Sequence, residues 1–417
     1  MNAPKFLFFG FFLLSGWLVL FISISDLFSL FSKSPILSNL LTRPIQKSKT
    51  ISSILKIPDY HFKPFSGQCE MTFMWPNYIK VPPSYLFDKN GKARKNHSTF
   101  SSTALRSNFF YSQSIMRKYS LFLYREGALQ QNSFQPQALK GIPILFIPGN
   151  AGNYKQARSV GKELHQVSLQ AGRAEDLFDL FSIDFDDELT AFSSQLILDQ
   201  AHFINTCVDT ILRKFYGPRS PHVSDLIVIA HSMAGISVRA AMRMDDYVPG
   251  SIKTVITLSS PLRSHPLQLD GQVARLYELL SQENNEDRNS STADLALLSI
   301  SAGFNDVLVH SDLTTRLFPS ASAESLSVSL YSMPAVGISA DHLSILWCNQ
   351  VVKTLAEAIA NLASQQGRTN SPRERLAALK EILVGRYQYL IILVVVVIVV
   401  TITITIIIYL FIYFRSS

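Results

Sequence analysis

The stretch VIAHSMAGI, Val228–Ile236, decides the fold of this 417-residue chain. A run of branched apolar residues ends at Ser232, and small residues stand two positions away on either side, Ala230 and Ala234. A short apolar run suits a buried strand, and small residues around a serine let a helix start at once and pack closely on that strand. The stretch therefore predicts a strand–turn–helix unit with Ser232 on a sharp turn.

The spacing of this unit is that of the nucleophile elbow, G-x-S-x-G, in which a strained turn projects a serine hydroxyl above a sheet. Alanine occupies both glycine positions here, Ala230 and Ala234. Alanine is small enough for close packing, so the change raises backbone strain without excluding the turn. The alternative interpretation is an ordinary serine that caps the helix N-terminus.

Segments on both sides of the elbow alternate between apolar strands and helical stretches. These segments are Gly141–Leu164, Leu177–Leu189, Ser193–Gly217, Ser224–Met244, Ile252–Pro261, Leu295–Val309 and Ser325–Ala363. Strand–helix alternation is typical of a parallel sheet with helices on both faces. The sequence thus predicts an α/β-hydrolase fold, with a doubly wound, mostly parallel sheet.

A serine nucleophile needs a base, and the base needs a carboxylate that fixes its tautomer. In this fold the three follow the chain order Ser, Asp or Glu, His. Asp306 follows a predicted strand, and His342 precedes a predicted helix, so we expect the order Ser232, Asp306, His342. Four other residues could take these roles, namely Asp312 or Asp341 as the carboxylate and His310 or His231 as the base.

The loop FIPGNAGNY, Phe146–Tyr154, follows the first predicted parallel strand. An oxyanion hole in this fold takes one backbone N–H from the residue after the nucleophile and another from this loop. We therefore expect the N–H groups of Met233, Asn150 and Ala151 to be the donors. The alternative is a plain turn between strand and helix.

Two long uncharged segments flank the central part of the chain, Phe6–Ser25 and Tyr389–Phe414. Each reaches the roughly 20 residues that a helix needs to cross a bilayer. We expect an N-terminal anchor over residues 1–25, with a cleaved signal peptide as the alternative, and a transmembrane helix over 389–414. Between them the sequence predicts a stalk over 26–66, an α/β domain over 67–365 and a linker over 366–388. Sequons at Asn96 and Asn289 favour a lumenal position for that domain.

Composition narrows the possible partners. The net charge of +7 is spread along the chain without a dense basic block, so we expect no nucleic-acid binding. The three cysteines, Cys69, Cys207 and Cys348, show no metal-ligand spacing, and we expect neither metal nor cofactor. In an oxidising lumen one pair of these cysteines could form a disulfide, and the sequence does not identify the pair.

Five motifs resemble those of the GPI inositol-deacylase family of the endoplasmic reticulum. They are CEMTFMWPNY, KYSLFLYREG, ILFIPGNAGNYKQARSVG, IAHSMAGISVRA and SADHLSILWCNQ, within Cys69–Gln350. This resemblance implies a membrane enzyme of α/β-hydrolase fold that removes the acyl chain from the inositol of glycosylphosphatidylinositol anchors. Ser232 carries over as the nucleophile, with Asp306 and His342 as its partners.

The chain departs from the family in two ways. The family has H-S-M-G-G where this chain has Ala234 as the fourth residue, and the family's multi-spanning C-terminal half has no counterpart here. The resemblance implies a lumenal domain on the membrane of the endoplasmic reticulum, with GPI lipid or GPI-anchored proteins as substrate. The alternatives are another lipid hydrolase or acyltransferase, and a non-catalytic binder of GPI-anchored proteins.

Overall fold

A computed structural model describes residues 68–87, 118–127, 133–172, 177–267, 269–281, 294–315, 323–365 and 371–385. All of them belong to the unit that spans Phe65–Ser417. Both apolar end segments, the stalk and the two sequons lie outside the described residues. Among the helices that are described, none combines the length and the apolar character that crossing a bilayer requires.

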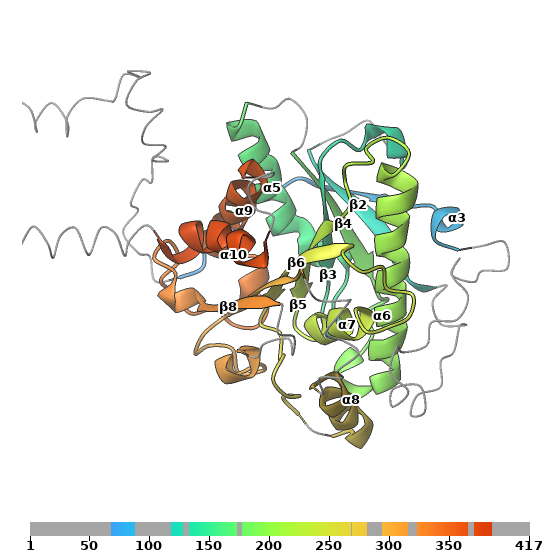
Figure 1. Cartoon of the computed structure of the whole chain (residues 1–417). Coiled ribbons are helices and arrows are strands. Elements are labelled where there is room, and N and C mark those ends of the chain that lie inside the picture. The colour runs from blue at the N-terminus through green and yellow to red at the C-terminus, as the bar shows by residue number, and fades with distance from the viewer. Residues whose placement is uncertain are drawn as a thin grey trace, which may run out of the picture. The chain divides into compact units, whose positions relative to one another are not determined.

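The described strands and helices alternate through most of the chain (Figure 1). The strands are β1 (Pro76–Lys80), β2 (Ser120–Glu126), β3 (Ile142–Ile147), β4 (Phe178–Asp184), β5 (Leu226–His231), β6 (Ile252–Leu258), β7 (Ala296–Ser301) and β8 (Glu324–Ser329). The α-helices are α3 (Pro83–Leu86), α5 (Arg158–Gln170), α6 (Ser194–Asp209), α7 (Ala234–Ala241), α8 (Gly271–Ser281), α9 (Asn349–Ser364) and α10 (Pro372–Lys380). Two π-helical segments, η5 (Thr210–Tyr216) and η10 (Glu381–Gly385), extend α6 and α10.

Within these residues the strands form one eight-stranded sheet in the order β1-β2-β4-β3-β5-β6-β7-β8. β2 runs antiparallel to both of its neighbours, and every pair from β4 to β8 is parallel. The central strands β5 and β7 are buried along their whole length, which explains their continuous apolar runs. The expected α/β-hydrolase-like fold with a mostly parallel sheet is confirmed.

Helices cover both faces of the sheet, with α6, α7 and α8 on one face and α5, α9 and α10 on the other (Figure 1). Successive β3 side chains enter opposite cores, Leu145 that of the α6 face and Phe146 that of the α5 face. Because the strands from β4 to β8 are parallel, their carboxyl ends lie at one edge of the sheet, and the loops that follow them begin there.

The structure contains elements that the sequence pattern did not predict, at the two ends of the described domain. β1 and β2 form the antiparallel end of the sheet, and the half-exposed pattern of β1 is typical of an edge strand. The expected linker over 366–388 is wrong for its described part, because 371–385 form α10 and η10. Leu376 and Leu379 of α10 are buried in the core, since this helix packs on the end of the sheet at β7 and β8.

Candidate active site

Ser232 lies on a tight turn between β5 and α7. Its φ of 54° is in the left-handed region, which a non-glycine residue occupies at a cost of about 1–3 kcal/mol. The Ser232 N–H donates to the Leu258 carbonyl at 2.9 Å, which fixes the turn to the end of β6. The predicted strand–turn–helix is therefore present, and Ser232 stands between the strand and the helix with a strained backbone.

Two glycines make room for this turn, and neither is at a glycine position of the elbow motif. A Cβ at Gly149 would lie 2.6 Å from the Ser232 Cβ, and one at Gly235 would lie 2.6 Å from the Ser260 Oγ. At distances this short, a Cβ at either position would force the neighbouring atoms to move. The close approach of the helix thus falls at Gly235, one residue beyond Ala234, which is why alanine is accommodated at Ala234.

His342 lies in the loop between β8 and α9, beside the hydroxyl of Ser232. The His342 Nε2 is 2.8 Å from the Ser232 Oγ, and the His342 Nδ1 is 2.9 Å from the Asp306 Oδ2. With Nδ1–H donating to the carboxylate, Nε2 is free to accept the serine proton. The three side chains therefore form one hydrogen-bonded line at the carboxyl edge of the sheet.

Asp306 is held in the loop after β7. The N–H groups of Leu308 and Val309 donate to its Oδ1 at 3.1 and 2.8 Å, and its other carboxylate oxygen accepts from His342. Burial in itself raises the pKa of Asp306, but hydrogen bonds from His342 and Val309 outweigh it and hold that pKa below its ordinary value. Asp306 is therefore ionised at neutral pH, as a carboxylate that orients an imidazole must be.

The four competing residues have other positions. Asp341 accepts the N–H groups of Leu343 and Ser344 at 2.9 and 2.8 Å, so it caps the turn that follows His342. His310 and Asp312 form a pair at 3.6 Å in which both side chains are about three-quarters exposed. Neither arrangement brings an imidazole or a carboxylate to Ser232.

His231, the last competitor, also makes no contact with the Ser232 hydroxyl, but it has a clear structural role. Its Nε2 lies 2.9 Å from the His342 carbonyl, so this nitrogen carries the proton and donates it. Burial, reinforced by the neighbouring His342, lowers the pKa of His231 to about 3. Through this bond the neutral ring of His231, the residue before Ser232, holds the backbone of His342, whose own ring contacts the Ser232 hydroxyl. Nothing in the sequence pattern predicts this bond, because it joins residues 111 positions apart.

The expected oxyanion donors divide into two groups. Within the described part of the chain, the N–H groups of Met233 and Asn150 have no hydrogen-bond acceptor. The N–H of Ala151 instead donates to the Glu188 carbonyl at 2.8 Å, so the expectation of a third donor at Ala151 is wrong. Asn150 is held by its side chain, whose Oδ1 accepts the Ala191 N–H at 2.9 Å. The structure leaves Met233 and Asn150 as the pair of available donors.

Exposed apolar side chains cluster in the loops around this edge. Nine of the thirteen large apolar side chains that are exposed in the described residues lie in loops after the carboxyl ends of strands. We name these nine the apolar rim: Leu189, Phe192, Leu267, Leu269, Phe304, Val307, Leu308, Tyr331 and Leu343. Three of them surround Asp306 in sequence, and Leu343 follows His342. Phe304 and Tyr331 lie side by side, with ring centroids 5.6 Å apart. Exposed apolar side chains that gather on a surface are typical of a contact with a membrane, a protein or an apolar ligand.

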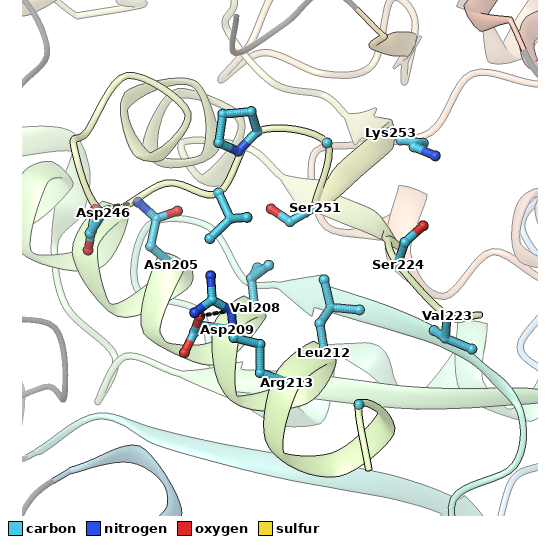
Figure 2. Close-up of a pocket in the computed structure, with 14 residues that line it drawn as sticks. Asn205, Val208, Asp209, Leu212, Arg213, Val223, Ser224, Asp246, Ser251 and Lys253 are labelled. Atoms are coloured by element: carbon cyan, nitrogen blue, oxygen red, sulfur yellow. Dashed lines mark hydrogen bonds and ion pairs between the residues drawn. The ribbon is translucent and has the colours of Figure 1, made fainter. Parts of the chain in front are cut away.

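A pocket lies at the opposite edge of the sheet, where β5 and β6 begin (Figure 2). Asn205 and Asp209 of α6 face Ser251 across it, and Asn205 donates to Asp246 at 2.7 Å. Asp246 also pairs with His202 at 2.6 Å, and Arg213 pairs with Asp209. The two bonds to Asp246 tie α6 to the segment before β6, and none of these groups pairs a nucleophile with a base. No three His, Cys, Asp or Glu side chains within the described ranges are grouped as metal ligands.

The chain is similar to known proteins over the segment that contains this site. A profile described as "PGAP1-like alpha/beta domain" matches residues 138–362, which include all three side chains of the hydrogen-bonded line. The GPI inositol-deacylase of Emericella nidulans is 33% identical over 286 residues, covering 62% of this chain and 25% of that protein. The GPI inositol-deacylase of Debaryomyces hansenii is 29% identical over 349 residues, covering 78% of this chain and 31% of that protein.

The chain therefore spans less than a third of the length of either relative. Among solved structures, lipase B of Aspergillus fumigatus matches 59% of this chain and 62% of its own, with a TM-score of 0.36 and 13% identity. The profile covers more than half of the residues, with the elbow, the carboxylate and the histidine inside it. The chain belongs to the PGAP1-like α/β domain family.

Proposed function

We propose that this chain is a membrane-bound serine esterase that removes the acyl chain from the inositol of GPI anchors. The observation that carries the proposal is the hydrogen-bonded line Ser232–His342–Asp306, in a domain whose relatives bear the name GPI inositol-deacylase. An ester of a lipid alcohol is a substrate that such a line can cleave without metal or cofactor.

The reaction follows from the geometry. His342 Nε2 takes the proton of Ser232 as its Oγ attacks the acyl carbonyl, and Asp306 stabilises the imidazolium through Nδ1–H. The N–H groups of Met233 and Asn150 stabilise the negative charge on the carbonyl oxygen. His342 then protonates the departing inositol oxygen, which leaves an acyl-serine. A water molecule that gives its proton to His342 releases the fatty acid and restores the serine.

Three features support a lipid substrate at a membrane. Four residues of the apolar rim stand in the loops that carry Asp306 and His342, so exposed apolar side chains lie next to the site in the chain. The two uncharged segments Phe6–Ser25 and Tyr389–Phe414 are long enough to anchor the chain on both sides of this domain. The sequons at Asn96 and Asn289 suit a lumenal domain. We therefore place the protein in the membrane of the endoplasmic reticulum, with the α/β domain in the lumen.

The test uses cells that lack inositol deacylase and that express the full chain or Ser232→Ala. An acylated inositol resists phosphatidylinositol-specific phospholipase C, so rescue restores release of surface GPI proteins by that enzyme. We expect rescue by the wild type and none by Ser232→Ala. The matched control is Asp312→Asn, an exposed position away from the line, which should rescue as well as the wild type.

Other outcomes contradict separate parts of the proposal. Equal rescue by Ser232→Ala would exclude this serine as the nucleophile. No rescue by any variant, together with hydrolysis of a simple ester by the purified wild type, would indicate a lipid hydrolase with another substrate. No rescue and no hydrolysis would indicate a binding protein that has kept the geometry of an esterase.

A further inference from the structure

Cys69 and Cys348 lie beside one another, although 278 residues separate them in the chain. Their thiols lie close enough that each shifts the pKa of the other. Met71 and Cys348 form an antiparallel bridge, and the Asn349 N–H donates to the Glu70 carbonyl at 2.7 Å. The short segment that contains Cys69 is therefore fixed alongside the start of α9 by main-chain contacts that are independent of the thiols.

A neighbouring side chain holds the same two segments in place. The Gln350 Nε2 donates to the Gln68 carbonyl at 3.0 Å, and its Oε1 accepts the Glu70 N–H at 3.3 Å. The same Oε1 accepts from the Cys348 thiol at 3.2 Å. These bonds reach both residues that flank Cys69, so the two sulfurs are held in register before any bond joins them. A disulfide forms without strain only where the backbone already supplies such a placement.

The third cysteine is excluded by the fold. Cys207 lies in α6, fully buried in the core of the α6 face. Cys348 is buried in the core of the α5 face, and Cys69 packs against that core. The sheet separates these two cores, so Cys207 cannot reach either of the other sulfurs.

We propose that Cys69 and Cys348 form a disulfide, which ties the segment before β1 to the segment after His342. The proposal rests on the lumenal placement proposed above, because a thiol pair of this kind persists as a disulfide in an oxidising compartment. It leaves Cys207 as a free, buried thiol.

The chemistry balances with a protein disulfide as the oxidant. Cys69, which is half-buried and the more accessible of the two, attacks the donor's disulfide and forms a mixed disulfide. The Cys348 sulfur then displaces the donor's cysteine. The two thiols lose two protons and two electrons in total, and the donor disulfide becomes a dithiol.

Burial of the two sulfurs should make the disulfide a stable link and not one that exchanges readily. Burial raises the pKa of the Cys348 thiol, and it also raises that of Cys69. A thiol of high pKa is a poor leaving group, so the bond exchanges slowly once it has formed. Cys348 stands six residues after His342, and its N–H donates to the Ser344 carbonyl at 2.8 Å. The disulfide therefore secures the C-terminal side of the turn that carries His342.

Thiol counting in the full chain tests the bond directly. Protein from sealed microsomes is denatured without reductant and labelled with a maleimide of defined mass. We expect one label before reduction, on Cys207, and three after reduction. Cys69→Ser and Cys348→Ser should each take two labels with or without reductant. The matched variant Cys207→Ser should take none before reduction and two after it.

Peptide mapping of the wild type needs no variant that could fail to fold. Trypsin without reductant should link peptide 57–80 to peptide 317–353, and reduction should separate them. Three labels before reduction on a chain that the microsomes protect from added protease would overturn the disulfide. Three labels on an unprotected chain would overturn the lumenal placement, and the disulfide with it. Neither readout depends on ester hydrolysis, so a linked chain that fails the GPI rescue would contradict the proposed function alone.

Discussion

The Nε2–H of His231 donates to the carbonyl of His342 at 2.9 Å, and the two imidazole rings are 4.8 Å apart. One of these histidines directly precedes the nucleophile, and the other contacts its hydroxyl. The bond therefore sets the distance between the β5 elbow and the loop after β8. It also makes His231 a positioning residue with a neutral ring, because burial lowers its pKa to about 3.

Two replacements of His231 should show whether its hydrogen bond or only its bulk matters, because leucine lacks the donor and glutamine keeps one. In His231→Leu the buried His342 carbonyl loses its donor, which costs about 1–3 kcal/mol of unfolding free energy. The His342 ring would also lose its fixed position, so kcat for ester hydrolysis should fall more than KM changes. His231→Gln keeps an N–H at a similar reach and should retain most of both properties. Denaturant unfolding and steady-state kinetics measure the two effects, and equal loss in both variants would contradict the positioning role.

The stability of the wild type should depend on the protonation of His231. Between its ordinary pKa of 6.5 and the folded value of about 3, the unfolded chain binds a proton that the folded chain does not bind. The unfolding free energy should therefore fall as pH drops below 6.5, with a slope of up to about 1.4 kcal/mol per pH unit. His231→Gln should remove this slope. Unfolding curves at pH 7.0, 6.0 and 5.0 measure it, and parallel pH profiles for the two proteins would contradict it.

Asp306→Asn should leave the fold in place and remove most of the activity. The amide can no longer accept Nδ1–H as a carboxylate does, so His342 loses its orientation and the stabilisation of its charged form. The corresponding change in serine proteases lowers kcat on the order of 10⁴-fold. Asp312→Asn is the matched control, since this exposed residue lies six positions further along and pairs with His310 outside the line. A similar loss in both variants would indicate a general effect on folding.

The sequence alone predicted the parallel strands from β3 to β8 and the three side chains of the line. Their signals are local, because each strand is a buried apolar run and each side chain follows the end of a strand or precedes a helix. The half-buried β1 strand carries a weaker signal, and the burial of α10 against the sheet depends on contacts between distant segments. For the same reason the capture of the Ala151 N–H by the Glu188 carbonyl could not be predicted.

Replacing an elbow alanine by glycine should not raise activity, whereas replacing Gly235 by alanine should destabilise the protein. Ala234→Gly restores the motif, but the close approach to Ser260 falls at Gly235, so kcat should not rise. Gly235→Ala places a Cβ 2.6 Å from the Ser260 Oγ and should cost about 1–3 kcal/mol through overpacking. Unfolding free energies and kcat for both variants provide the test. A gain of activity in Ala234→Gly would show that alanine impairs the turn.

The apolar rim should matter for a lipid substrate in a bilayer and not for a soluble one. Phe304 and Val307 are 80% and 89% exposed and flank Asp306, so their replacement by serine removes apolar surface without opening the core. Each exposed side chain that enters the membrane contributes about 1.5–3 kcal/mol, so the double variant should bind vesicles and cleave an acylated lipid in them much less well.

A short soluble ester reaches Ser232 without the membrane, and its kcat/KM should stay unchanged in the double variant. The matched control is Leu169→Ser. This exposed residue lies at the C-terminal end of α5, which runs back from the carboxyl edge of the sheet, and it should affect neither substrate. A loss on both substrates would mean that Phe304 and Val307 support the Asp306 loop itself. No loss on vesicles would mean that the rim contacts something other than the lipid.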